Sequence, residues 1–307
     1  MVIVVVAPGQ GSQTPGFLSP WLTEPAFADH LAALSEGAGL DLVLHGTESD
    51  ADTIRDTAVA QPLIVAAGLL TLKALLDGER AAKIGGIAGH SVGEITAAAG
   101  AGVLTETDAM HLVAERGRAM ADAASLVATG MSAVLGGDEQ QLLERLAELE
   151  LEPANFNGGG QIVVAGALDA LEQLKAEPPA GARVVPLQVA GAFHTRFMQP
   201  AVERLAAVAA TLAPGDPAST LWTNRDGSTV TTGTAFLDLL VGQVSSPVRW
   251  DLCMASFQEA GVTGIIELAP AGALVGLAKR GLKGVPTVAV KTPDDLPAAI
   301  ELIEQSA

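Results

Sequence analysis

The sequence lacks tyrosine, contains one cysteine, and has few aromatic residues, with three Trp and seven Phe among 307 residues. The single cysteine, Cys253, cannot form a disulfide within the chain. One cysteine is also too few for a structural zinc site of the usual cysteine-rich kind. A lone cysteine is compatible with a reducing compartment.

Basic residues are scarce as well. The chain has 17 Lys and Arg against 35 Asp and Glu, which gives a formal net charge of −18. Binding to nucleic-acid phosphates or to anionic membrane surfaces needs clustered positive charge. The composition therefore argues against nucleic acid and against a membrane as partners.

Long apolar runs are missing too. No uncharged internal stretch is longer than 16 residues. One of that length, 57–72, includes Gln61 and Pro62, so it falls short of a membrane span and predicts a buried helix. The apolar N-terminal segment has no basic residues before it and ends at Pro8, too early for a signal peptide. Since no targeting segment is recognised, we expect a cytoplasmic protein.

Hydrophobic residues, in contrast, make up 49% of the chain, and the mean hydropathy is +0.38. This excludes a disordered chain, and the length allows one large domain or two unequal ones. The β-branched run 2–7 and the short segment 84–89 predict buried strands. Helices are expected at 24–37, 61–76, 92–100 and 106–124. Strands that alternate with helices predict a parallel sheet covered on both faces.

A different order of elements begins near residue 127. Strand, helix, strand, strand, helix and strand are expected at 130–135, 138–150, 152–157, 161–166, 168–177 and 182–190. This order is typical of a ferredoxin-like unit. We predict that residues 127–190 form a small inserted subdomain, and that residues 1–126 and 191–307 form the large domain. Its later part is expected to hold helices at 197–213, 234–244, 251–260 and 271–281, and strands at 220–224, 264–268 and 285–290.

Residues 89–93 read G-H-S-V-G and match the pattern G-x-S-x-G. They lie between a predicted strand and a predicted helix, which is the context that a nucleophile elbow requires. Ser91 then lies at the start of a helix, where free N–H groups favour developing negative charge. The alternative is a glycine-rich turn in which the serine is incidental.

A nucleophilic serine needs a base, and the chain has five histidines. His30 and His111 lie on predicted helices, where surface or packing roles are expected, and His45 lies in a predicted loop with no visible partner. The side chain of His90 is expected to leave the sharp turn in another direction than Ser91. His194 lies where the chain returns to the large domain, at the edge of an interdomain cleft. It is the best candidate for the base, with a structural histidine as the alternative.

Six motifs in order make the chain similar to the malonyl-CoA:acyl carrier protein transacylases and to the acyltransferase domains of polyketide and fatty-acid synthases. The motifs are P-G-Q-G-S-Q at 8–13, G-H-S-V-G-E at 89–94, Arg116-Gly117 with Met120, A-N-F-N at 154–157 with Gln161 and Gly166, A-F-H at 192–194, and Gln243 with Pro247, Val248 and Trp250. The resemblance covers nearly the whole chain. It implies an α/β fold with a large hydrolase-like domain and the small subdomain.

The resemblance implies roles for particular residues. Ser91 would take the acyl group, and His194 would act as base and then as acid. Arg116 would hold the malonyl carboxylate with its two-pronged guanidinium, whereas without the motif a solvated helix residue would be expected. The backbone N–H groups of Gln10 and Val92 would form the oxyanion hole.

Three more residues would support the site. The hydrolase template places a carboxylate behind the histidine, but the resemblance implies that the backbone carbonyl of Gln243 orients His194. Asn157 belongs to the A-N-F-N motif. Phe193 favours malonyl over methylmalonyl by filling space beside the α-carbon, a preference worth only about 1–3 kcal/mol for one methyl group.

The chain departs from the family at three positions. Ile95 stands where the family often has an aromatic residue, Phe156 stands where it has tyrosine, and Gly191 replaces a histidine that is common in modular synthases. The first two substitutions fit a chain without tyrosine and lie outside the expected chemistry.

The expected reaction is ping-pong transfer of malonyl from malonyl-CoA through Ser91 to acyl carrier protein. No metal or other cofactor is expected, and Thr14 breaks the dinucleotide fingerprint. The expected state is a monomer. Because both partners are acidic, we expect a local basic patch, with the candidates Arg183, Arg196, Lys279, Arg280 and Lys283. The alternatives are a serine hydrolase and a non-catalytic module that binds carrier protein.

Overall fold

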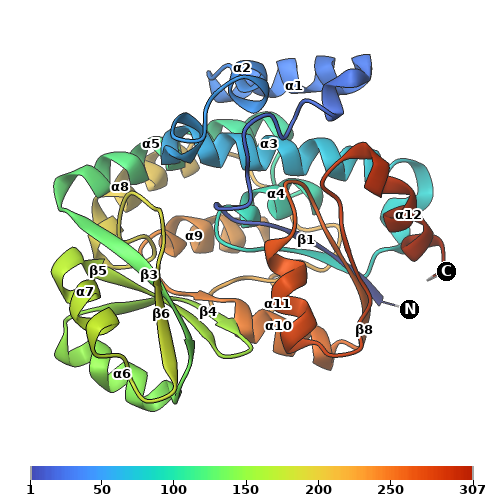
Figure 1. The fold of residues 1–307 in the computed structure, drawn as a ribbon. Coiled ribbons are helices and arrows are strands. Elements are labelled where there is room, and N and C mark those ends of the chain that lie inside the picture. Colours follow the sequence, from blue (N-terminus) through green and yellow to red (C-terminus); the bar gives the residue numbers. More distant parts are fainter. Residues whose placement is uncertain (1, 306–307) are drawn as a thin grey trace.

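The computed structural model describes residues 2–305, which form an α/β fold with two sheets (Figure 1). Sheet A has four parallel strands in the order β2-β1-β8-β9. Their bounds are Gly86–Gly89 for β2, Val2–Ala7 for β1, Val262–Glu267 for β8 and Thr287–Ala289 for β9. The predicted parallel sheet is confirmed.

β1 is an inner strand of sheet A that is covered on both faces. Ile3, Val5 and Ala7 belong to the larger apolar cluster, whereas Val4 and Val6 belong to a second one. Successive side chains of a strand point to opposite faces, so an unbroken apolar run needs cover on both. The helices outside the second sheet are α1 Pro25–Ala38, α2 Leu42–Thr47, α3 Thr57–Leu75, α4 Gly93–Gly100, α5 Glu106–Leu126, α8 Gln199–Ala209, α9 Gly233–Gln243, α10 Trp250–Glu259, α11 Ala273–Gly281 and α12 Leu296–Glu304.

Helix α3 is long, apolar and mostly buried. It begins at Thr57, before the predicted start at residue 61, because the side chain of Asp56 accepts a hydrogen bond from the N–H of Ala58 and caps it. With 19 residues it is longer than the uncharged stretch suggested, and its length and composition alone would allow a membrane span. However, 78% of its apolar window is buried inside the fold, which confirms the prediction of a buried helix.

Sheet B has five strands in the order β6-β3-β5-β4-β7. Four of these strands and two helices follow the predicted order, as β3 Thr129–Gly136, α6 Glu139–Glu148, β4 Glu152–Gly158, β5 Gln161–Ala167, α7 Leu168–Ala176 and β6 Ala182–Pro186. These four strands pair antiparallel, as a ferredoxin-like unit requires. The fifth strand, β7 Val248–Arg249, comes from far along the chain and pairs parallel to β4. The division of the chain at residues 127 and 190 stays a prediction.

Three predicted segments need correction. Strand β6 ends at Pro186 and not at residue 190, although Leu187 N still donates to Met131 O over 2.9 Å. Residues 220–224 form single bridges and no strand, and the helix expected at 197–213 is confined to α8 after a short 3-10 turn at 196–198. Two helices were not predicted, α2 and α12. The chain therefore closes with α12, just after a capping box formed by Thr292 and Asp295, and not with β9.

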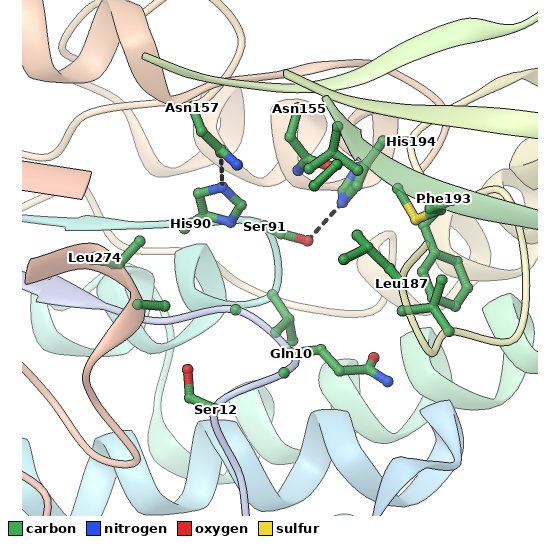
Figure 2. A pocket seen from close by; sticks show the side chains of 18 of the residues that line it. Gln10, Ser12, His90, Ser91, Asn155, Asn157, Leu187, Phe193, His194 and Leu274 are labelled. Atoms are coloured by element: carbon green, nitrogen blue, oxygen red, sulfur yellow. Dashed lines mark hydrogen bonds between the residues drawn. The ribbon is translucent and has the colours of Figure 1, made fainter. Parts of the chain in front are cut away.

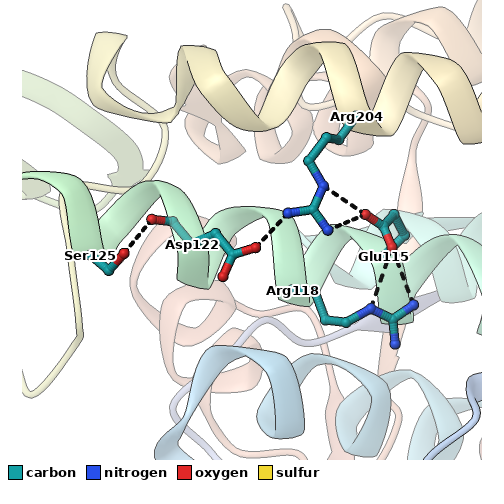
Figure 3. Close-up of polar contacts among 5 residues, drawn as sticks. All are labelled: Glu115, Arg118, Asp122, Ser125 and Arg204. Atoms are coloured by element: carbon teal, nitrogen blue, oxygen red, sulfur yellow. Dashed lines mark hydrogen bonds and ion pairs between the residues drawn. The ribbon is translucent and has the colours of Figure 1, made fainter.

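Helices α5 and α8 are joined on the surface by an ion-pair group (Figure 3). Arg204 of α8 donates from Nε to Glu115 of α5 over 2.9 Å and also pairs with Asp122. Arg118 binds the same Glu115 over 3.2 Å. Exposed pairs like these contribute about 0–1 kcal/mol each. The position of these pairs matters because they join α5, which carries Arg116, to α8, which follows the segment that carries His194.

Helix α4 lies very close to the end of β1. A Cβ added at Gly93 would lie 2.2 Å from the carbonyl oxygen of Ala7, which belongs to the strand backbone. We expect Gly93→Ala to lower the free energy of unfolding, because overpacking of this kind costs about 1–3 kcal/mol. Urea denaturation followed by circular dichroism would measure it.

Gly276→Ala on α11 is the matched control. A Cβ added there meets no atom within 4 Å, so this change is expected to be neutral or to stabilise by up to about 1 kcal/mol. Equal effects of the two substitutions would contradict the close approach of α4 to β1.

Candidate active site

Ser91 lies in the sharp turn between β2 and α4. The turn is closed by hydrogen bonds from Gly93 N to His90 O and from Glu94 N to Ser91 O, both 3.0 Å. Ser91 has a φ of 54°, which is unusual for a residue with a side chain. The fold must hold this conformation, which costs roughly 1–2 kcal/mol for an L-residue. The strained conformation directs the hydroxyl toward the cavity described below (Figure 2).

His194 lies beside the serine. Its Nε2 is 2.7 Å from Ser91 Oγ, and its Nδ1 is 2.9 Å from the backbone carbonyl oxygen of Gln243. A carbonyl can only accept, so Nδ1 carries the proton of the neutral ring and Nε2 is free to accept from the hydroxyl. The contact with the Gln243 carbonyl therefore fixes the tautomer that a general base needs.

The surroundings also keep His194 neutral. Burial, followed by the positive charge of Arg116, lowers the pKa of His194 from its usual 6.5 to about 3. Both effects disfavour the imidazolium ion. The side chain is therefore an unprotonated base at neutral pH.

Arg116 of α5 is 2% exposed, so the alternative of a solvated helix residue is wrong. Its Nη1 donates to Gln61 Oε1 over 2.7 Å, and its Nη2 donates to Gln243 Oε1 over 2.8 Å. The same Nη2 lies 3.4 Å from Ser91 Oγ. Burial lowers the pKa of Arg116 to about 10, which still leaves it cationic at neutral pH.

Ser91 and His194 line a cavity of about 390 Å³ (Figure 2). Its walls come from the segment after β1, from β3, β4 and β5, from the segment after β6 and from α11. They include Gln10, Ser12, Met131, Asn155, Leu187, Val189, Phe193 and Leu274. A mostly apolar wall with a few polar groups is typical of a site for a small ligand.

Gln10 and Val92 line this cavity together with Ser91. The side chain of Gln10 donates to the carbonyl oxygen of Arg55 over 3.1 Å, which anchors its backbone. Val92 is the residue immediately before α4. Their role as an oxyanion hole stays a prediction.

The side chain of His90 leaves the turn in another direction than Ser91, as expected. Its Nε2 is 2.9 Å from Asn157 Oδ1, and Asn157 Nδ2 donates to Gln161 Oε1 over 3.0 Å. Burial lowers the pKa of His90. Asn157 and Gln161 thus join one wall of the cavity to the turn that holds the serine.

The three remaining histidines lie outside the site. His30 is buried and its Nε2 is 2.7 Å from Glu106, and His111 is exposed on α5. The expectation for His45 was wrong, because it belongs to helix α2 and its Nδ1 is 3.0 Å from Ser49 Oγ.

Two buried residues escaped the sequence reasoning. Glu94, 1% exposed, accepts from Asn224 N over 2.6 Å and from the side-chain amide of Gln243. Burial raises its pKa to about 8. Glu94 ends the G-H-S-V-G-E motif, so a signal was present. Asn224 carried no signal, because it stood at the end of a predicted strand.

The candidate basic residues are distributed unevenly. Arg280 lines the cavity. Lys279 of α11 and Lys283, which follows α11, are exposed and are close to Arg280 in sequence. Arg183 is exposed on β6. Arg196 is paired with Glu152, which reduces the charge it offers to a partner.

Three comparisons with known proteins agree with this geometry. Residues 4–294 match the family described as the acyl transferase domain. The chain is 56% identical to a malonyl CoA-acyl carrier protein transacylase of Mycobacterium bovis, over 96% of this chain and 98% of the relative. The crystal structure of MCAT from Mycobacterium tuberculosis superposes with a TM-score of 0.94 at 55% identity, over 98% of this chain and 100% of the other.

A fourth similarity concerns a complex. A malonyl-transacylase solved with its type II PKS acyl-carrier protein is 31% identical and has a TM-score of 0.91, over 98% of this chain and 100% of that chain.

The lowered pKa of His194 predicts the pH dependence of Ser91 reactivity. Labelling of Ser91 by an uncharged sulfonyl fluoride is expected to be constant between about pH 5 and 7, because a base with a depressed pKa is protonated only at lower pH. Mass spectrometry would give the rate, with circular dichroism to verify folding at each pH. A fall centred near pH 6.5 would show that His194 titrates normally. His194→Ala should abolish the labelling.

Proposed function

The chain belongs to the acyl transferase domain family, and on that premise we propose how its site moves malonyl groups from malonyl-CoA to acyl carrier protein. This enzymatic activity, an S-malonyltransferase reaction, supplies extender units for fatty-acid synthesis and for polyketide synthesis. The observation that carries the assignment is Arg116, a buried cation whose Nη2 lies 3.4 Å from the nucleophilic oxygen of Ser91.

In the first half-reaction, Ser91 Oγ attacks the thioester carbonyl carbon of malonyl-CoA while His194 Nε2 takes the hydroxyl proton. The tetrahedral intermediate places its negative oxygen toward the backbone N–H groups of Gln10 and Val92. When the C–S bond breaks, His194 returns the proton to the leaving thiolate. Free CoA departs and a malonyl ester remains on Ser91.

The second half-reaction reverses these roles. The phosphopantetheine thiol of acyl carrier protein gives its proton to His194 and attacks the ester carbonyl. The C–O bond to Ser91 then breaks, and His194 returns the proton to the serine oxygen. No net proton or electron is consumed, so we propose that the reaction needs no metal or redox cofactor.

Arg116 selects the acyl group. Its two amide partners, Gln61 and Gln243, are neutral, so its positive charge is available to the malonyl carboxylate. Charge-assisted bonds from a guanidinium to a carboxylate are strong and directional. Phe193, 7% exposed in the cavity wall, would narrow the space beside the α-carbon and disfavour methylmalonyl.

The remaining expectations belong to the same proposal. Ser91, His194 and Arg116 contact one another within one chain, and we propose that the protein acts as a monomer. We propose a cytoplasmic location for the enzyme. The acidic chain argues against nucleic acid and membranes as partners, and Ser91 paired with His194 argues against a non-catalytic module. A serine hydrolase is the remaining alternative, because it shares the nucleophile and base.

Single-turnover experiments with malonyl-CoA test the assignment. Intact-mass measurement is expected to show a malonyl adduct on the wild-type protein and none on Ser91→Ala. Adding acyl carrier protein should remove the adduct and give malonyl-carrier. If free malonate forms as fast without carrier protein as malonyl-carrier forms with it, the protein is a hydrolase.

Arg116→Ala tests the carboxylate contact. We expect malonyl transfer to fall by about 10- to 100-fold, which corresponds to about 1.5–3 kcal/mol for hydrogen bonds to a charged group. Acetyl transfer, which lacks the carboxylate, is the internal control and should change much less. An equal loss for both acyl groups would contradict the proposed role.

The basic patch can be tested by charge reversal. Arg280→Glu combined with Lys283→Glu is expected to raise KM for acyl carrier protein about 2- to 10-fold at low salt, with a smaller effect at high salt. Lys175→Glu on α7 is a charge-reversing control outside the cavity wall. If the double variant behaves like this control, the carrier protein docks elsewhere.

A further inference from the structure

Asn224 lies behind the nucleophile, where the parallel ladder of sheet A stops. The chain beside β2 makes two backbone bonds with Ile87, from Ile87 N to Thr220 O over 2.8 Å and from Trp222 N to Ile87 O over 3.4 Å. Further along the chain, the side chain of Asn224 makes the next hydrogen bonds in place of backbone groups. Its Nδ2 donates to Gly89 O, and its Oδ1 accepts from Ser91 N, each over 2.7 Å.

A side-chain amide suits this position because it has a donor and an acceptor side by side, like a peptide group. The two bonds reach Gly89 and Ser91, one on each side of His90. They therefore fix the peptide groups that lead into Ser91, whose φ is 54°. A strained residue keeps its conformation only where its surroundings over-determine it, and here Asn224 holds the N-terminal side of Ser91 while Gln243 Nε2 donates to Ser91 O over 3.2 Å on the other side.

Asn224 is itself held firmly. It is fully buried, its N–H donates to Glu94 Oε1 over 2.6 Å, and its carbonyl accepts from Arg249 N over 2.8 Å. The other oxygen of Glu94 accepts from the side-chain amide of Gln243. One carboxyl group thus connects the residue behind Ser91 with the residue behind His194.

We propose that Asn224 is a positioning residue that holds the backbone of Ser91 in its reactive conformation. This inference rests on the proposed acyl transfer through Ser91. Asn224 does not line the cavity, and none of its hydrogen bonds goes to Arg116. It therefore sets how fast the serine ester forms, and does not set which acyl group is chosen.

Asn224→Asp is the sharpest test because the two side chains have nearly the same shape. The carboxylate keeps an acceptor for Ser91 N, but it has no donor for Gly89 O and places an oxygen against it. We expect the acylation rate constant from rapid-quench experiments to fall about 10- to 100-fold for malonyl-CoA and for acetyl-CoA alike. The half-saturating malonyl-CoA concentration and the malonyl-to-acetyl preference should stay unchanged.

Ser256→Ala is the matched control, because Ser256 Oγ accepts from the indole of Trp222 in the same segment over 3.0 Å. It removes one hydrogen bond without touching the turn at Ser91, so acylation should proceed at the wild-type rate. If Ser256→Ala slows acylation as much as Asn224→Asp, loss of segment stability explains both, and the proposal is overturned. Unchanged acylation in Asn224→Asp would overturn it as well.

Two additions keep the outcome clear. If Asn224→Asp does not fold, Asn224→Ala, which introduces no repulsion, takes its place, with the same slowing expected. Labelling of Ser91 by the uncharged sulfonyl fluoride provides a readout without malonyl-CoA. Slow labelling of the Asn224 variant supports the positioning role even if wild-type protein forms no malonyl adduct, a result that would count against the proposed function alone.

Discussion

A buried cation is the constraint on which the site depends. Arg116 is almost fully enclosed, and burying a charge is costly unless it has hydrogen-bond partners. The fold provides two neutral amides, Gln61 and Gln243, which satisfy N–H groups without cancelling the charge. The nearest acidic group, Glu94, is itself buried with its pKa raised to about 8, so its charge is disfavoured at neutral pH. The site thus keeps a positive charge next to Ser91, as the proposed contact with a malonyl carboxylate requires.

Gln243 connects this charge with the catalytic pair. Its backbone carbonyl fixes the tautomer of His194, its side-chain oxygen accepts from Arg116, and its amide nitrogen donates to Glu94 and to Ser91 O. A single residue at the end of α9 therefore contacts His194, Arg116 and the backbone of Ser91, the proposed base, selecting cation and nucleophile. A carbonyl stabilises the imidazolium less than a carboxylate would. This is compatible with thioester chemistry, in which the leaving thiolate is easier to expel than an amine.

The proposed basic patch bears on how a chain of acidic composition could receive acidic partners. A net charge of −18 would repel CoA and acyl carrier protein at long range. Near the cavity, however, Arg280 lines the wall and two lysines are close to it in sequence, while most of the acidic side chains are elsewhere on the chain. Local potential, more than total charge, guides a partner into a cleft.

The sequence by itself determined the features that depend on neighbouring residues: the buried strand β1, the strand–turn–helix around Ser91, and the order of elements from β3 to β6. Each has a local cause, such as a β-branched run or a glycine pair. The tertiary structure decided the rest. The chemistry of the Gln243 side chain does not predict that its backbone carbonyl faces His194, because every residue has the same backbone carbonyl. Asn224 and β7 reach the site and sheet B from far along the chain, and only packing brings them there.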